Sequence, residues 1–507
     1  MSSLAIPRQA ARWRVSRSLW ELFSTHGSDV LLGVAITVLA AILLINSPNV
    51  FNVDSWLALV TGRELWQTGI PHHEILTVMA HGKAWVDQQW LSQLASYGIY
   101  LIGGLGLLGT VNAALIVLAV AGAAVGARRL GARPGVILIT LALCLFSIAP
   151  SREVRTQEFA MPLFVAVAYL LAADIRAPSR RVYWCFPILV LWANLHGSVT
   201  QGAMLVSLRG LLILWEQRHR LRHPARLWYR PLALIVGAPL TLLLTPYGVS
   251  SIGYYRTMLF GGTLTHAVSE WAPVTSSPAI AAVFFLAVGI AIWSFGRHPE
   301  RTTTWERIAL LVLAAASISV IRNLLFFGLF ALMVMPVSLA ADPAAAQLPN
   351  RLRGRVNLGL ATAALAAAVV AGAALIATPA SSIELRNQRP AVLRVVARVT
   401  NADPAIRVLT DDHYADWLLW RDPSLGGRLA YDVRYELLSA RQVSALQAVF
   451  TVTGVNYKQA ARGYRLLVLD RRYEPATVSA FRHEPGARIL FNDGDEIVIL
   501  RSARQAA

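Results

Sequence analysis

Hydrophobic residues along this chain gather in repeated apolar runs of about 17–24 residues, which short arginine-rich breaks separate. Runs of this length match the thickness of the hydrocarbon core of a membrane, so each one predicts a membrane-spanning helix. Eleven spans are predicted, near residues 28–47, 107–127, 134–150, 158–174, 183–195, 199–216, 231–246, 278–296, 306–321, 323–341 and 356–378. The expected fold is therefore mainly α, a polytopic membrane helical bundle.

One further apolar stretch, residues 88–104, is hydrophobic enough to be considered a twelfth span. A crossing there would move the basic segment ARRLGARPG, which follows the next run, to the side of the membrane away from the other basic breaks. We therefore predict an amphipathic helix at the membrane surface, with Trp90, Tyr97 and Tyr100 at the interface. Only the run that begins near residue 107 is expected to cross.

The pattern changes after Thr378 and Pro379. Of the 28 acidic residues in the chain, 14 lie between residue 379 and the C-terminus. Short alternating segments at 407–412, 427–436, 464–470 and 488–501 predict strands, and HYADWLLWR predicts a short helix. The sequence thus predicts a basic cytoplasmic N-terminus (1–27), a transmembrane domain (28–378) whose first extracytoplasmic loop is 48–106, and a soluble extracytoplasmic α/β domain (379–507).

Composition and charge support a membrane protein. Hydrophobic residues make up 56% of the chain and charged residues 15%, with a mean hydropathy of +0.51. The net charge of +18 raises the possibility of nucleic-acid binding, but the basic residues lie in the breaks between apolar runs, as membrane topology predicts. Nucleic acid is therefore excluded as a partner. Cys144 and Cys185 lie within apolar segments, so neither a disulfide framework nor a zinc site is expected.

The distribution of arginine also sets the orientation. With the N-terminus inside, nearly every basic cluster faces the cytoplasm, and an odd number of spans places the C-terminal domain outside. The chain is expected to be a multi-pass protein of the bacterial cytoplasmic (inner) membrane. Its first apolar run is long and lacks a small-residue cleavage site, so we expect it to be an uncleaved span.

With this orientation, unusual polar residues gather at the outer ends of the helices. These residues are Asp54, Trp56, His72, His73, Glu74, Asp87, Gln88, Gln89, Trp90, Arg152, Arg155, Gln157, Asn194, His196, Glu270, Arg322 and Asn323. Ionisable groups at membrane depth are costly unless they are paired or solvated, so their location on one face predicts a functional site.

These residue types suit a reaction at an anionic group and a hydroxyl. Arg152, Arg155 and Arg322 offer planar donor groups that match phosphate or pyrophosphate oxygens. Asp54 or Asp87 could remove the proton from an attacking hydroxyl. The remaining residues are expected to line the donor and acceptor pocket: His72, His73, Gln89, Trp90, Asn194, His196, Glu270 and Asn323. Histidines there could bind phosphate, ligate a metal or transfer protons.

Each residue also has a purely structural interpretation. Asp54 fits a helix N-cap, the His72–His73 pair an exposed loop, and His196 a turn that ends a helix. The arginines fit contacts with lipid head groups, and the tryptophans fit anchors at the membrane interface. No single residue decides between the two interpretations; their common side of the membrane favours a site.

Three segments resemble the GT-C superfamily of integral membrane glycosyltransferases, which includes protein O-mannosyltransferases and lipid A aminoarabinose transferases. Asp54 follows the first span, as the acidic motif of the family does, and precedes RELWQTGIPHHEI. WVDQQWLSQLASYGIYLIGGLGLLGTVNAA resembles the family's surface helix leading into the second span. SREVRTQEFAMPLF resembles its arginine-containing entry into a later span.

The resemblance implies an inverting enzyme that transfers a sugar from a polyprenyl-phosphate-linked donor. The acceptor would be a glycan, lipid or protein hydroxyl outside the membrane, with membrane lipid as a further partner. Asp54 would be the general base and Asp87 a second acid. Ser55 and Trp56 follow Asp54 where many relatives carry another acid. The cofactor therefore stays unknown: a divalent metal is possible, but the sequence holds no convincing set of metal ligands.

Two other functions remain open. A transporter or lipid flippase would be expected to show polar residues at the membrane midplane and inverted repeats. A non-catalytic cell-envelope scaffold would account for the C-terminal domain but not for the acids and arginines near the spans. A surface helix that covers a cavity containing Asp54 would favour sugar transfer over transport.

Overall fold

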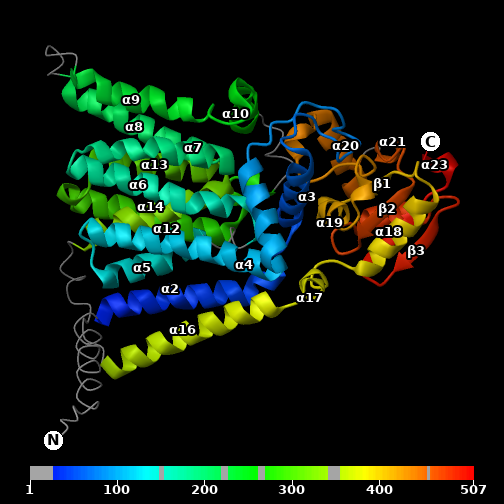
Figure 1. Ribbon diagram of the computed structural model, residues 1–507, viewed down its shortest axis with the longest axis horizontal. Helices are drawn as coiled ribbons and strands as arrows, with labels where there is room; N and C mark the ends of the chain where they lie inside the picture. Colours follow the sequence, from blue (N-terminus) through cyan, green and yellow to red (C-terminus); the bar gives the residue numbers. More distant parts are fainter. Residues whose placement is uncertain are drawn as a thin grey trace, which may run out of the picture.

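A computed structural model of the chain describes residues 27–147, 153–218, 226–260, 269–340, 354–453 and 457–506. Long helices lie side by side in a bundle, and a smaller α/β domain lies beyond one end of it (Figure 1). Most of the predicted N-terminal segment 1–27 falls outside the described residues. The fold is mainly α with a small C-terminal sheet, as the sequence predicted.

A helix coincides with each of the eleven apolar stretches predicted to span the membrane. These helices are α2 (Gly27–Asn46), α4 (Trp90–Arg129), α5 (Pro134–Cys144), α6 (Ala160–Arg176), α7 (Cys185–Leu195), α8 (Val199–Gln217), α9 (Arg226–Thr241), α12 (Pro278–Arg297), α13 (Thr304–Ser319), α14 (Leu324–Leu339) and α16 (Gly354–Ala377). Among the described residues, six helical segments are long and apolar enough to cross a membrane by themselves. The chain is a multi-pass membrane protein, and the number of its spans stays a prediction.

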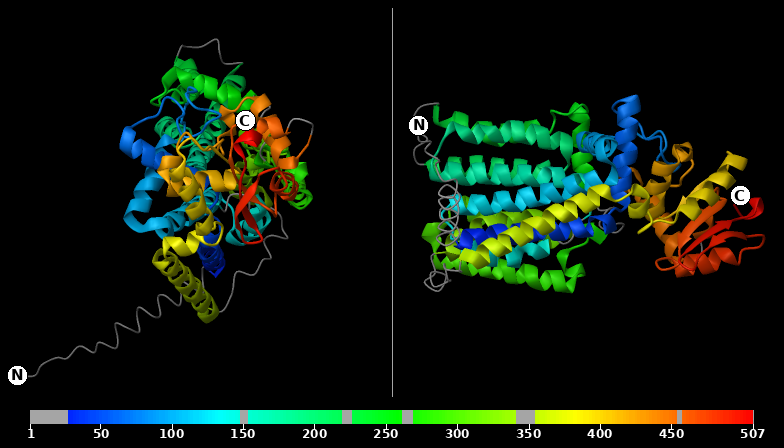
Figure 2. Two further views of the ribbon diagram at one scale, coloured as in Figure 1. Left: turned by 90° about the vertical axis from the view of Figure 1, so that its right-hand side faces the viewer. Right: turned by 60° about the horizontal axis from the view of Figure 1, so that its bottom comes forward.

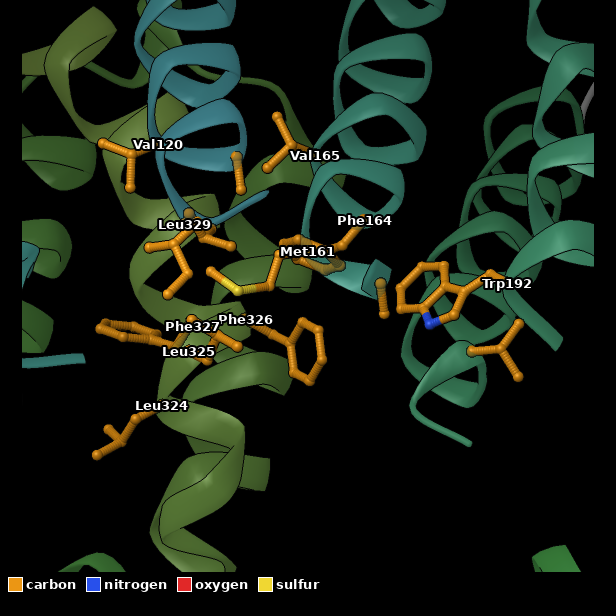
Figure 3. Packing of buried hydrophobic residues seen from close by; sticks show 14 of the residues in the cluster. Val120, Met161, Phe164, Val165, Trp192, Leu324, Leu325, Phe326, Phe327 and Leu329 are labelled. Carbon is orange, nitrogen blue, oxygen red and sulfur yellow. The ribbon is translucent and has the colours of Figure 1, made fainter. Parts of the chain in front are cut away.

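Helix α14 forms the centre of the bundle. It is apolar on all sides and buried from Leu324 to Ser338, as expected for a helix surrounded by others. Phe326 of α14 packs edge-on against Phe164 of α6, with ring centroids 5.0 Å apart, and Trp192 of α7 extends this contact (Figure 3). Helix α16 lies at the edge against α2 (Figure 2) and exposes large apolar side chains such as Val369, as a lipid-facing helix would.

Helix α4 consists of two parts that meet at a pair of glycines. Gly104 has φ +63° and ψ −162°, a conformation that disfavours residues with a side chain, and Gly103 is also non-helical. The break falls at the end of the predicted surface helix, residues 88–104. The first part of α4 and helix α3 (Val53–Thr68) run across the ends of the long helices (Figure 1), where they separate the bundle from the C-terminal domain.

The C-terminal domain contains a four-stranded sheet with the order β1 (Val408–Thr410), β2 (Leu466–Asp470), β4 (Glu496–Leu500), β3 (Arg488–Asn492). Strand β1 pairs parallel with β2, and the other pairs are antiparallel. Its principal helices are α18 (Pro390–Ala402), α19 (Asp412–Arg421), α20 (Ala440–Thr451) and α22 (Pro475–Arg482), and the short α17 (Ala380–Glu384) links it to α16.

The prediction of a strand over 427–436 was wrong. Leu429 forms only isolated bridges, one with Val408 of β1 and one with Thr77 in the loop between α3 and α4. The segment therefore joins the C-terminal domain to that loop instead of extending the sheet. A partner so distant in sequence is not visible in the local alternation of residues.

Buried ion pairs tie the helices together at the end of the bundle away from the C-terminal domain. Asp174 of α6 pairs with Arg230 of α9 and lies 3.8 Å from Arg209 of α8. Arg176 of α6 pairs with Glu306 of α13 at 2.7 Å. Charged side chains within a membrane bundle need such partners, so these contacts fix the order of four helices.

We expect Asp174→Ala to destabilise the bundle strongly. Its removal leaves Arg209, whose side chain is 6% exposed, without its buried partner, and breaking a buried ion pair from one side costs about 3–5 kcal/mol. Glu216→Ala is the matched control, because Glu216 contacts the same arginine at 3.3 Å but is 45% exposed, and exposed pairs contribute about 1 kcal/mol or less. Thermal unfolding in detergent measures the stability of both variants. Equal losses of stability would contradict the assignment of Asp174 as the buried partner that the bundle needs.

Candidate active site between the helical bundle and the C-terminal domain

Helix α3 begins in a way that brings Asp54 to the ends of the long helices. Its N-cap is Asn52, whose backbone N–H donates to Ser55 Oγ at 3.2 Å. The Ser55 hydroxyl donates in turn to the carbonyl of Val154 at 2.6 Å, which fixes the start of α3 against the segment before α6. Asp54 lies in the first turn, where the helix dipole favours a carboxylate. It is therefore not the N-cap and its side chain is available for other contacts.

Asp54 belongs to a cluster of paired charges. Arg155 Nε lies 3.0 Å from Asp54 Oδ2, and the same guanidinium pairs with Glu153 and with Glu270. The other oxygen of Glu270 lies 4.0 Å from Arg322 Nη1. We call these five residues the ion-pair cluster. They come from α3, from the segment before α6 and from the short turns at 269–271 and 321–323.

The cluster is partly open to water. The side chain of Arg155 is 9% exposed, whereas those of Asp54, Glu270 and Arg322 are 31%, 24% and 28% exposed. Arg322 Nε also donates to Gln157 Oε1 at 2.9 Å. Arg155 is thus enclosed by three carboxylates, while Asp54 and Arg322 each keep a surface that a bound molecule could contact.

Polar contacts attach the first part of α4 to the bundle beside this cluster. Trp90 Nε1 donates to Asn194 Oδ1 at 3.0 Å, and Asn194 Nδ2 donates to the carbonyls of Val190 and Leu244. The hydroxyl of Thr156 donates to Gln89 Oε1. These bonds hold the end of the α3–α4 loop (residues 69–89) against the helices that carry the cluster.

His196 and Asn323 also lie here. Burial, together with the positive charges of Arg322 and Arg155, lowers the pKa of His196 well below its usual value, so the ring is neutral at physiological pH. Its Nδ1 is 2.8 Å from Ser198 Oγ. Asn323 accepts a hydrogen bond from Gln201 at 3.2 Å. Both residues have structural partners and lie next to the arginines.

None of His72, His73 and Asp87 is among the contacts of the cluster. His72 and His73 are exposed in the α3–α4 loop, and the ring of His72 packs edge-on against Tyr247 at 5.7 Å. Asp87 is 2% exposed, and its Oδ2 has no hydrogen-bond partner among the described residues. Arg152 lies outside the described residues.

The C-terminal domain contributes acidic residues, Asp412 and Glu436, for which the sequence favoured turns and salt links over sugar binding. Burial raises the pKa of Asp412, and the charge of Asp54 acts in the same direction, so the two carboxyls are close enough for their charges to interact. Burial also raises the pKa of Glu436 to about 7, and the charge of Asp54 again contributes. Tyr435 donates to Asp412 Oδ2 at 3.1 Å. This domain thus adds carboxyl groups to a site whose bundle side holds Arg155 and Arg322 together with the carboxylates that pair with them.

Glu153 was missed, although it lies two positions before Arg155. That spacing is a usable signal only once the backbone is known to be extended at Arg155. Gln157, which was expected at the outer face, accepts a hydrogen bond from Arg322. Within the part of the chain that the structure describes, no group of three or more His, Cys, Asp or Glu side chains is placed to hold a metal ion.

An apolar groove of about 540 Å³ opens beside α9 and α7. It is lined by Phe186, Ala233, Gly237, Leu240, Thr241, Leu243 and Leu244. The carbonyl of Leu244 accepts from Asn194 at 2.9 Å, and Asn194 in turn accepts from Trp90. One end of the groove is therefore connected to Trp90 through Asn194. A hydrophobic chain in this groove would have its polar end near the site.

Comparison with solved structures shows a shared fold. ArnT from Cupriavidus metallidurans, in a crystal structure bound to undecaprenyl phosphate, matches with a TM-score of 0.51 at 15% identity, over 94% of this chain and 99% of that chain. The oligosaccharyltransferase of Archaeoglobus fulgidus, tethered with an acceptor peptide, matches with a TM-score of 0.50 at 11% identity, over 93% and 74%. No family model and no curated protein matches the sequence.

The buried carboxyl of Asp87 predicts a stability that depends on pH. Burial, opposed by the charge of Arg434, raises the pKa of Asp87 to about 7 in the folded chain, against about 3.9 in an unfolded one. Between these two pH values the folded state binds more protons than the unfolded state. The free energy of unfolding therefore falls as pH rises from about 4 to about 7. Asp87→Asn removes this loss.

We therefore expect the melting temperature of Asp87→Asn minus that of the unmodified protein to be larger at pH 8 than at pH 5. Thermal unfolding in detergent at the two pH values measures the difference. Glu216→Gln is the control, because the Glu216 side chain is 45% exposed and its partner Arg209 keeps its charge at both pH values, so the substitution should give the same small shift at pH 5 and pH 8. A difference in melting temperature between Asp87→Asn and the unmodified protein that does not change with pH would contradict the prediction.

Proposed function

We propose that this chain, which has the fold of the GT-C membrane glycosyltransferases, transfers a sugar from a polyprenyl-phosphate-linked donor to an acceptor hydroxyl, with inversion at the anomeric carbon. The observation that carries the proposal is the ion-pair cluster: a carboxylate at the start of α3 lies 3.0 Å from Arg155, which shares Glu270 with Arg322. The similar structures support it, since ArnT binds undecaprenyl phosphate and the oligosaccharyltransferase is also seen with dolichol-phosphate.

In the proposed reaction Asp54 is the general base. The acceptor oxygen attacks the anomeric carbon, the bond from that carbon to the phosphate oxygen breaks, and the hydroxyl proton moves to Asp54. The ion pair with Arg155 holds the carboxylate in a fixed orientation. Asp54 suits this role better than Asp87, because 31% of its side chain is exposed while Asp87 is buried.

Arg322 is the proposed ligand of the departing lipid phosphate. Its side chain is 28% exposed and its nearest carboxylate, Glu270, is 4.0 Å away, so its guanidinium can turn toward an anion. Positive charge placed where negative charge develops stabilises the transition state. Arg155, already enclosed by three carboxylates, positions Asp54.

The apolar groove beside α9 is the proposed site for the start of the polyprenyl chain. All but one of its lining side chains are apolar, and its end at Leu244 connects through Asn194 to Trp90. A lipid lying there would present its phosphate toward the bundle side of the site. This arrangement supports transfer over transport, since Trp90 begins a helix that covers the ends of the spans.

The topology follows from the same proposal. The site lies at the end of the bundle next to the C-terminal domain, and positive-inside distribution places that end outside the cytoplasm. We infer that residues 28–378 form the transmembrane domain, that 379–507 form an extracytoplasmic domain, and that the membrane is the bacterial inner membrane.

Asp54→Asn should abolish transfer without loss of lipid binding. Removal of a general base costs about 100- to 10,000-fold in turnover, while the neutral amide keeps the size of the side chain. Transfer from a panel of radiolabelled polyprenyl-phosphate sugars measures turnover, binding of undecaprenyl phosphate measures the lipid site, and NMR of the product gives the anomeric configuration. Glu64→Gln, on the same helix, serves as the control. Unchanged turnover in Asp54→Asn, or a retained configuration, would exclude the proposed mechanism.

Leu240→Trp should weaken donor binding by filling the groove. We expect the KM for the lipid-linked donor to rise about fivefold or more with little change in kcat, the pattern of a lost ground-state contact. Leu232→Trp is the matched control: Leu232 lies on the same helix and is similarly exposed, 44% against 54%, but does not line the groove. Equal KM values for the two variants would place the lipid elsewhere.

A further inference from the structure

Arg434 of the C-terminal domain is buried beneath the α3–α4 loop. Within its own segment it pairs with Asp432, whose carboxylate accepts from the Arg434 backbone N–H at 3.0 Å and from Nε at 3.0 and 3.1 Å. Nη2 of the guanidinium contacts the same carboxylate. This nitrogen also contacts a residue far away in sequence.

Those distant contacts all belong to the α3–α4 loop. Arg434 Nη2 donates to Glu74 Oε1 at 2.6 Å, across 360 positions of sequence. The guanidinium also lies over the ring of Trp85, with its central carbon 4.4 Å from the ring centroid, a cation–π contact. The side chains of Arg434 and Glu74 are 3% and 0% exposed. Burial disfavours the charge of Arg434, but Asp432 and Glu74 more than offset it and raise its pKa.

The segments before and after Arg434 in the sequence also contact the α3–α4 loop through their backbone. Val78 and Met79 donate to the carbonyls of Leu429 and Ala430 at 2.8 and 3.0 Å, as in a short parallel ladder. Lys83 Nζ donates to the carbonyl of Leu437 at 2.6 Å. The loop therefore lies on the C-terminal domain over most of its length, with Arg434 as the charged centre of the contact.

The end of this loop reaches the site. Glu74 fixes the loop's first half by accepting from the backbone of Leu76 and Thr77. The second half leads directly to Gln89, which contacts Thr156, and to Trp90, which contacts Asn194. A displacement of the loop would change how the first part of α4 covers Asp54 and Arg155.

We propose that Arg434 is a positioning residue: by joining Glu74, Asp432 and Trp85 it holds the α3–α4 loop in the conformation that encloses the site. The C-terminal domain is then a structural part of the site and not a separable binding module. An arginine suits this task because its planar fork contacts two carboxylates while its face stacks on an indole, which a lysine cannot do. The inference rests on the proposed function for its kinetic consequence only.

The chain offers a matched control in Arg472. Asp470 and Arg472 form the same local pair two residues apart, with Asp470 accepting from the Arg472 backbone N–H at 2.7 Å and from Nε at 3.1 Å. Arg472 is 47% exposed, and its other carboxylate contacts, Asp495 and Glu496, lie within the C-terminal domain. Arg472→Met thus removes a similar pair without touching the α3–α4 loop.

The experiment compares Arg434→Met, Arg434→Lys and Arg472→Met in the full-length protein in nanodiscs. For Arg434→Met we expect hydrogen exchange at 74–87 to rise about tenfold or more, and kcat to fall about 10- to 100-fold, since a misplacement of about 1 Å can cost on the order of 100-fold. The KM for the donor should change less than kcat. Arg434→Lys should recover only part of both losses, and Arg472→Met should leave both at the wild-type values.

Exchange at 74–87 that stays at the wild-type rate in Arg434→Met would overturn the inference, as would equal losses in Arg434→Met and Arg472→Met. If Arg434→Met does not fold, Glu74→Gln takes its place with the same expected results, because it removes the charge that pairs with Arg434 while its amide oxygen can still accept from the backbone of Leu76 and Thr77. If the unmodified protein transfers no sugar, the proposed function fails, but the exchange measurement still decides whether Arg434 holds the loop.

Discussion

The ion pair between Asp54 and Arg155 is the contact on which the arrangement of the site depends. Arg155 is nearly enclosed and needs carboxylates around it, since a buried charge without a partner is strongly unfavourable. Asp54, Glu153 and Glu270 supply them, and Glu270 extends the cluster to Arg322. One guanidinium therefore brings together the start of α3, the segment before α6 and two turns at the ends of other helices.

The sequence predicted the features that depend on local pattern. Apolar runs located all eleven helices, because the length and continuity of a run reflect the thickness of the membrane. The glycine pair at 103–104 ends the predicted surface helix, and the acid after the first run led to a resemblance whose fold agrees with the fold that the chain shares with ArnT. The common side of Asp54, Arg155, Glu270 and Arg322 was expected from topology; which of them pair with one another was not.

Contacts between distant segments could not be predicted. Nothing near Arg434 in sequence indicates that its partner is Glu74, and the alternating residues at 427–436 predicted a strand because their pairing with Thr77 and neighbouring loop residues is non-local. Asp412 and Glu436 looked like turn residues for the same reason. His72 and His73 stood out in the sequence because histidine often has a chemical role, yet they are exposed in the loop.

The charges of the site are unevenly exposed, and this bears on how a donor would bind under the proposed function. Arg155 is enclosed by carboxylates, whereas Arg322 keeps a surface that is 28% exposed and has its carboxylate contact, Glu270, at 4.0 Å. A lipid phosphate would therefore be attracted most strongly to Arg322, which favours the orientation of the donor that directs its phosphate toward this arginine. In that orientation the lipid would lie toward the apolar groove and the anomeric carbon toward Asp54. One partly exposed guanidinium would thus orient the donor before any contact with the sugar is made.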